Sequence, residues 1–249
     1  MKTQRHHVIS LLFVACLIFI SSVTFAAIPD DLRRNINQAS SNEEAFGPVF
    51  WTEDGGWFIS TNKRVRFGGR LPDDLMRQIR SLGDGGVEIR DIFWSEDGGW
   101  YLNVNKRVSF GGRIPDDLTR NIREAAGNEE IIANAFWTED GGWFIRTDKR
   151  AYFGGRAPDD LLKNFKQAIS NQEEIGPVYW TEDGGWFLNT NKRVNFGGRV
   201  PNGFARSVKS SAGKSETFFE AYWVEFGDWF IRTNTRVDLG SDQFPSFAP

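Results

Sequence analysis

The strongest constraint in this sequence is a tryptophan repeat of constant period. Five tryptophans are spaced by 43 residues with no insertion or deletion: Trp51, Trp94, Trp137, Trp180 and Trp223. A second set follows six residues behind, and the two sets account for all ten tryptophans: Trp57, Trp100, Trp143, Trp186 and Trp229. A fixed period of this length indicates one structural unit used repeatedly. The units occupy residues 28–70, 71–113, 114–156, 157–199 and 200–242, with a tail at 243–249.

Each unit predicts one short helix followed by three short strands. In the first unit, Pro29 suits the first helical turn, and two Asp residues follow at the positive end of the helix dipole. Leu32, Ile36 and Ala39 then form one apolar stripe. Asp-Gly-Gly and Asn-Lys turns separate the segments that follow, which are rich in aromatic and β-branched residues. The predicted strands are residues 49–53, 57–61 and 64–67.

The first two strands of each unit carry large apolar side chains on both faces, so each sheet needs cover on both sides. Five such sheets can stack around an axis. The predicted fold is therefore α+β and strand-dominated, a closed five-fold β-propeller-like ring of 43-residue units, each with one short helix and a three-stranded antiparallel sheet. An open solenoid is the alternative. Docking of residues 28–39 on the fifth unit would close the ring.

The first 26 residues have the pattern of a secretory signal peptide. Lys2 and Arg5 precede an uncharged apolar run at 8–20, and small residues lead to Ala26. We expect this segment to be removed, which leaves residues 27–249 as a single five-repeat domain. The product would be secreted, periplasmic or extracellular, with no stable membrane span.

Signal removal would restrict the chemistry of the mature chain. His6, His7 and Cys16 all fall within the signal, so no His or Cys would remain. This excludes Ser-His-Asp and Cys-His catalysis, zinc sites built on His or Cys, and disulfides. Without Lys2 and Arg5, 28 basic residues face 33 acidic residues, for a net charge of −5. That balance disfavours nucleic acid as a partner.

Two charged positions recur in every unit. They are Glu53, Glu96, Glu139, Glu182 and Glu225, and Arg64, Arg107, Arg150, Arg193 and Arg236. We interpret them as a cross-strand ion pair. Because glycoside hydrolysis needs two carboxylates in different environments, five equivalent copies argue against that activity. The acidic turns could bind Ca²⁺ through oxygen ligands, but no D-x-D-x-D-G run is present, and we predict no cofactor.

The repeat resembles known families in some of its elements. The period, the five copies and the Gly-Gly-Trp hairpin resemble five-bladed lectin propellers of the tachylectin type, although lectin blades have four strands and no such helix. The Asp-Gly-Gly-Trp and Ile-Pro-Asp-Asp-Leu elements resemble repeats of uncharacterised secreted bacterial proteins. One helix and three strands in five copies are also similar to the pentein α/β-propeller. Pentein enzymes use Cys and His, so their activity is not implied here.

These observations favour a secreted, non-enzymatic, multivalent binding module, with glycan as the first ligand class. A protein-interaction or structural repeat module is the alternative, and a carboxylate-dependent glycoside-acting enzyme comes third. The predicted partner is a glycan or a protein surface, and the oligomeric state stays open.

The predicted binding residues lie on the rim formed by the Glu-Asp-Gly-Gly turns. They are Trp57, Trp100, Trp143 and Trp186, Asp54, Asp97, Asp140 and Asp183, and Arg70, Arg113, Arg156 and Arg199. An indole would stack on a sugar ring while the charged groups bond to its hydroxyls. The fifth unit departs from this pattern and should bind poorly. The alternative for all ten tryptophans is packing between sheets in the core.

Overall fold

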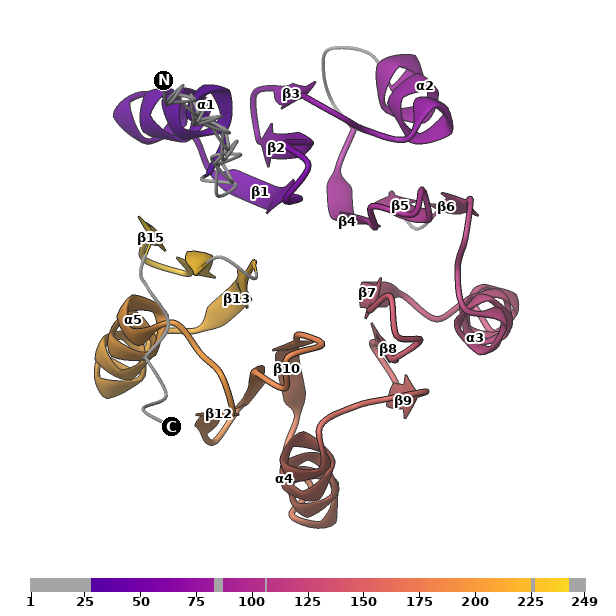
Figure 1. Ribbon diagram of the computed structural model, residues 1–249, viewed down its shortest axis with the longest axis vertical. Coiled ribbons are helices and arrows are strands. Elements are labelled where there is room, and N and C mark those ends of the chain that lie inside the picture. Colours follow the sequence, from indigo (N-terminus) through magenta and orange to yellow (C-terminus); the bar gives the residue numbers. More distant parts are fainter. Residues whose placement is uncertain (1–27, 83–86, 106, 225–226, 242–249) are drawn as a thin grey trace, which may run out of the picture.

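Five helix-plus-sheet units lie in a circle around a common centre (Figure 1). The computed structural model describes residues 28–82, 87–105, 107–224 and 227–241. The predicted signal peptide and the tail at 243–249 lie outside the described residues, as does Glu225.

Every unit contains one helix and three strands, in the order that the repeat predicts. The helices are α1 (Asp30–Ser41), α2 (Asp73–Ser81), α3 (Asp116–Gly127), α4 (Asp159–Ser170) and α5 (Asn202–Gly213). The first strands are β1 (Phe46–Trp51), β4 (Ile89–Trp94), β7 (Ile132–Trp137), β10 (Ile175–Trp180) and β13 (Phe218–Trp223). The second strands are β2 (Trp57–Thr61), β5 (Trp100–Val104), β8 (Trp143–Thr147), β11 (Trp186–Thr190) and β14 (Asp228–Thr233). The third strands are β3 (Val65–Gly68), β6 (Arg107–Gly111), β9 (Ala151–Gly154), β12 (Val194–Gly197) and β15 (Val237–Ser241).

The helix of the first unit forms for the reasons that the sequence indicates. It begins after Pro29, has two acidic residues in its first turn, and buries Leu32, Ile36 and Ala39. The first strand begins and ends earlier than predicted. It ends earlier because Thr52 already closes the turn, through a hydrogen bond from its amide to the Gly56 carbonyl at 3.0 Å.

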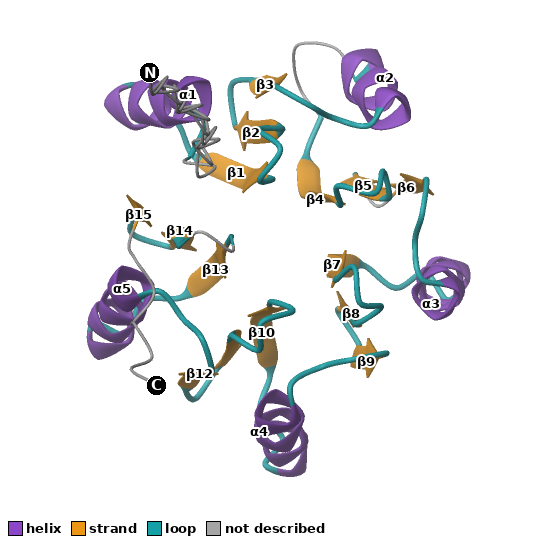
Figure 2. Cartoon of the chain, in the orientation of Figure 1, coloured by secondary structure: helices purple, strands orange, loops and turns teal. Residues whose placement is uncertain are grey.

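The three strands of each unit pair antiparallel in chain order. The first strand of each unit lies nearest the centre and the helices form the outer layer (Figure 2). In every unit the first pairing contains a bulge close to the start of the first strand. A bulge places an extra residue outside the ladder of hydrogen bonds and redirects its side chain.

Five aromatic side chains from the first strands meet around the centre. They occupy equivalent positions: Phe50, Phe93, Phe136, Tyr179 and Tyr222. Each ring contacts the next, with centroids 5.0, 6.2, 5.4, 5.9 and 5.6 Å apart around the circle, the last distance joining Tyr222 back to Phe50. The contacts therefore run through all five units, including the first and the last.

The first and last units are also joined by polar and apolar contacts. The Tyr222 hydroxyl donates to the Val49 carbonyl at 2.9 Å, as the Tyr179 hydroxyl does to the Trp223 carbonyl between the fourth and fifth units. Leu32 of α1 belongs to the same apolar cluster as Leu239 of β15. α1 itself packs mainly on β2 and β3 of its own unit, so docking of the first helix on the fifth unit stays a prediction.

The paired glycines of each unit bring two turns into backbone contact. A Cβ on Gly56 would lie 1.9 Å from the Arg70 carbonyl oxygen, and one on Gly69 would lie 1.8 Å from the Gly55 carbonyl oxygen. Gly69 also has a φ of +70°, which favours glycine. The glycines therefore hold the C-terminal end of the third strand against the Glu-Asp-Gly-Gly turn.

The predicted ion pair between Glu53 and Arg64 is wrong in its acidic partner. Arg64 bonds instead to Glu44, which follows the helix, with 3.1 Å between Nε and Oε2. Equivalent pairs join Arg150 to Glu130, Arg193 to Glu173 and Arg236 to Glu216. The reason is sheet geometry: Glu53 follows the end of β1 at one rim, whereas Arg64 precedes β3 at the opposite rim.

Two Tyr-to-Phe variants test whether the first and last units are joined in solution. We expect Tyr222→Phe and Tyr179→Phe each to lower the free energy of unfolding by about 1 kcal/mol, because each removes one hydrogen bond to a neighbouring unit. Chemical denaturation would measure both. A cost for Tyr179→Phe with none for Tyr222→Phe would indicate an open array.

A matched pair of alanine variants tests the backbone contact between turns. Gly55 and Gly69 both have positive φ, but a Cβ on Gly55 meets nothing within 4 Å. We expect Gly55→Ala to cost about 1–2 kcal/mol for the backbone conformation alone. Gly69→Ala should cost clearly more, because its Cβ collides with a carbonyl oxygen. Equal melting temperatures for the two variants would contradict the close contact.

Candidate functional site

The four tryptophans predicted to stack on a sugar are buried. Trp57 is 6% exposed, and Trp100, Trp143 and Trp186 are each 5% exposed. Each indole lies against the first glycine of the third strand, since a Cβ on Gly68 would approach the Trp57 ring to 2.8 Å. All ten tryptophans are buried, which agrees with the packing interpretation. Glycan stacking on the second tryptophan set stays a prediction.

The charged residues predicted beside these tryptophans are exposed on the expected rim. Asp54 accepts a hydrogen bond from the Thr52 hydroxyl at 2.6 Å and so caps its own turn, and Asp97, Asp140 and Asp183 are bonded in the same way. Arg199 lies 3.6 Å from Asp183. In the fourth unit the structure therefore brings Asp and Arg together, while the four indoles are buried. Trp100 lines a surface groove with Asp74 and Arg77.

A cavity of about 260 Å³ opens at the centre of the same rim. Its wall is built from four tryptophans of the first set and four recurrent glutamates: Trp51, Trp94, Trp137 and Trp180, and Glu53, Glu96, Glu139 and Glu182. The Glu182 carboxylate accepts the Asp140 amide of the preceding unit at 3.0 Å. This glutamate therefore joins neighbouring units, a structural role that the sequence pattern does not reveal. The five central aromatic rings form the floor of this cavity.

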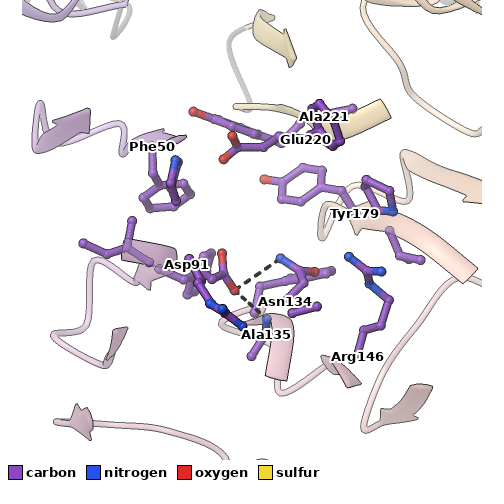
Figure 3. A pocket seen from close by; sticks show the side chains of 18 of the residues that line it. Phe50, Asp91, Asn134, Ala135, Arg146, Tyr179, Glu220 and Ala221 are labelled. Carbon is purple, nitrogen blue, oxygen red and sulfur yellow. Dashed lines mark hydrogen bonds between the residues drawn. The ribbon is translucent and has the colours of Figure 1, made fainter. Parts of the chain in front are cut away.

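A second cavity lies on the other side of the aromatic rings, and we call it the axial pocket (Figure 3). Its volume is about 70 Å³. The same five rings line it, together with charged and polar residues from the second, third and fifth units: Arg90, Asp91, Asn134, Arg146, Glu220 and Arg232. In Figure 3 the side chains of Asp91, Arg146 and Glu220 surround one central space.

The axial pocket is where the five units differ most in chemistry. The position that is Asp91 in the second unit is Pro, Asn, Pro and Glu in the others. The bulge residue just before it is Gly47, Arg90, Ala133, Gly176 or Phe219. The repeat is thus strict where units pack and irregular around this pocket.

Both acids of the axial pocket bond to the backbone of the next unit. Asp91 Oδ2 accepts the Ala135 amide at 2.9 Å, and Glu220 Oε2 accepts the Val49 amide at 3.4 Å. Burial raises the pKa of Asp91 to about 8, and the charge of Glu220 adds to that rise. Burial also raises the pKa of Glu220 to about 7, against the opposing charge of Arg232. At neutral pH the Asp91 carboxyl is therefore largely protonated.

The basic residues differ in how they are paired. Arg232 bonds to Glu220, with 3.3 Å between Nε and Oε2, and Arg90 bonds to Glu88 at 3.4 Å. Arg146 donates to the Ile175 carbonyl at 3.3 Å and forms no ion pair within the described residues. Burial lowers the pKa of Arg146 and the nearby charge of Asp91 opposes that change.

The polar groups of the axial pocket do not satisfy one another fully. In the described part of the chain, Nε of Arg90, Nε of Arg146 and Oδ1 of Asn134 are buried without a hydrogen-bond partner. An unmet buried polar group costs about 1–3 kcal/mol. Phe219, half of whose surface is exposed, stands beside this set and is held by the Arg232 guanidinium, 5.3 Å from its ring centre.

Sequence reasoning missed this pocket because it searched for residues common to all units. Asp91, Arg146 and Glu220 come from three different units and break the repeat pattern. The signal that could have found the two acids is the departure from the repeat at a position that holds Pro in the first and fourth units; Arg146 instead stands where other units carry Ser, Asn or Arg.

Comparisons with known proteins add little to this geometry. No protein-family model and no curated protein matches the chain. A solved structure that is similar over 80% of the chain is described as the extracellular domain of a one-component system of B. thetaiotaomicron, with 12% identity and a TM-score of 0.25. The chain spans 34% of that protein. The resemblance to tachylectin-type lectins stays a prediction.

Two further features bear on partners. The described residues contain no group of three or more His, Cys, Asp or Glu side chains placed to hold a metal ion. None of the helices in that part of the chain combines the length and apolar character that a membrane crossing requires.

Replacement of Trp100 separates the two interpretations of the second tryptophan set. We expect Trp100→Ala to lower the free energy of unfolding by about 3–5 kcal/mol, because the indole is buried against Gly111. Thermal and urea melts would measure this. An unchanged melting temperature together with the loss of one ligand site would instead support the stacking interpretation.

Proposed function

We propose that the chain is a closed five-bladed ring of propeller type that acts as a secreted, non-enzymatic binding module, with its main site in the axial pocket. The ligand class is a glycan. One observation carries this proposal. Charged residues, buried polar atoms without a hydrogen-bond partner and an exposed aromatic ring gather at the one place where the otherwise strict repeat is broken.

The chemistry of the axial pocket suits a sugar. Phe219 offers an exposed aromatic ring beside the opening, and Arg232 holds that ring in place. Arginine, carboxyl and amide groups from three units supply hydrogen-bond donors and acceptors. Recognition sites of this kind join an apolar surface to a few placed polar groups.

Binding is proposed rather than catalysis because of the state of the two acids. Glycoside hydrolysis uses one protonated and one ionised carboxyl group. Burial moves the pKa of Asp91 and of Glu220 in the same direction, to about 8 and about 7. Both carboxyl groups are also engaged already: each accepts a backbone amide of the next unit, and Glu220 is paired with Arg232. Neither is therefore placed as a free base or nucleophile.

One other surface, the Glu-Asp-Gly-Gly rim, supplies two alternatives. The exposed Asp and Arg residues on the Glu-Asp-Gly-Gly rim recur in four units and would give up to four equivalent glycan sites. A protein partner could bind the same acidic rim. The axial pocket, in contrast, exists once per ring.

Stoichiometry and a matched pair of variants test the proposal. A glycan array would identify a ligand, and calorimetry should then give one site per chain. Phe219 and Ile169 are exposed to the same extent, 50% and 51%, but only Phe219 lines the axial pocket. We expect Phe219→Ala to weaken binding at least about tenfold, the equivalent of 1.4 kcal/mol, and Ile169→Ala to leave it unchanged.

Three outcomes would contradict the axial assignment. Four equivalent sites that persist in Phe219→Ala would place binding on the rim. Equal effects of the Phe219 and Ile169 variants would exclude the aromatic contact. An array with no bound glycan would reject a glycan ligand altogether.

A further inference from the structure

The charges of the axial pocket define the sign of its ligand. Glu220 and Arg232 form one pair, and Arg90 bonds to Glu88 outside the pocket. Arg146 forms no ion pair within the described residues, and its pocket neighbour Asp91 carries little charge at neutral pH. The interior is therefore left with positive charge, which favours an anionic group.

The size of the pocket limits what can enter it. A volume of about 70 Å³ holds only a few water molecules, so a whole sugar ring does not fit. A carboxylate does fit. A ring attached to it would stay at the opening, where Phe219 is exposed.

We propose that the axial pocket recognises the carboxylate of an acidic saccharide, a uronic acid, with Arg146 and Arg90 as the cationic donors and Phe219 as the surface beneath the sugar ring. This inference rests on the proposed function and specifies the ligand class of the same site. The buried, unpartnered Nε groups of Arg90 and Arg146 are the donors that such a ligand would satisfy after a small rotation of either side chain.

Asp91 would make recognition dependent on pH. The charged and titratable groups facing it are Arg146 of β8, Glu220 of β13 and Tyr101 of β5, with Arg90 beside it on β4. Below its pKa of about 8, Asp91 is protonated and can donate a hydrogen bond to the ligand carboxylate. Above that pH it is ionised and repels the same group, and Glu220, whose pKa is about 7, adds to the repulsion, so affinity should fall as pH rises.

The experiment compares uronate oligosaccharides with their own methyl esters. Galacturonate, alginate and hyaluronan oligosaccharides, each beside its ester, are titrated into the full chain by calorimetry, with a neutral-glycan array run in parallel. We expect at least one uronate to bind about tenfold or more tightly than its ester at about pH 6, and this preference to shrink at about pH 9.

Three pocket variants and one control locate the effect. Arg146→Gln should remove the preference for the acid while ester binding persists, and Arg146→Lys should keep part of it. Arg66→Gln makes the same charge change on an exposed residue away from the pocket and should alter nothing. Asp91→Asn retains an acceptor for the Ala135 amide and should keep the affinity at about pH 6 while reducing the loss at about pH 9, the remainder coming from the ionisation of Glu220.

The possible failures are distinguishable. Equal affinity for acid and ester, or binding of neutral glycans alone, overturns the carboxylate inference and leaves the proposed function intact. Absence of binding to every acidic and neutral glycan overturns both. A preference for the acid that is unchanged in Arg146→Gln overturns the assignment of Arg146.

Discussion

The structure depends on a simple constraint: no unit can bury its own sheet. Each three-stranded sheet carries large apolar side chains on both faces, and three strands with one helix cannot cover them. Burial is completed only by the neighbours on either side, so that each apolar cluster combines residues of adjacent units. The circular arrangement, the contact between the first and last units and the central ring of aromatic side chains all follow from this dependence.

The circle of five aromatic side chains at the centre has a second effect, because it separates two cavities of different chemistry. The cavity on the Glu-Asp-Gly-Gly rim is lined by residues that nearly every unit supplies in the same form. The axial pocket is lined by residues that differ from unit to unit. One side of the molecule is therefore close to five-fold symmetric. The other side lacks this symmetry, so a ligand would bind there in one orientation.

Much of the fold could be predicted from the sequence, because its determinants are local and repeated. Leu32, Ile36 and Ala39 mark the helix, and the glycine turns separate the strands. The partner of Arg64 could not be predicted, since it depends on which end of the sheet each residue occupies. The axial pocket could not be predicted either, because Asp91 and Glu220 are 129 positions apart in the sequence and come near each other only when the units are placed in a circle.

The bulge in each first strand has a consequence for how such a ring can be altered. The bulge residue is Gly47, Arg90, Ala133, Gly176 or Phe219, and in none of these cases does it contribute to the ladder of strand pairs. Its side chain can change without shifting the register of the sheet. Three of these positions, Arg90, Ala133 and Phe219, line the axial pocket. A side chain on Gly47 or Gly176 would instead meet Ser60 at 3.3 Å or Asn189 at 2.6 Å. The molecule is therefore a scaffold in which three positions around one opening could be selected from a library while the register of the sheets is kept.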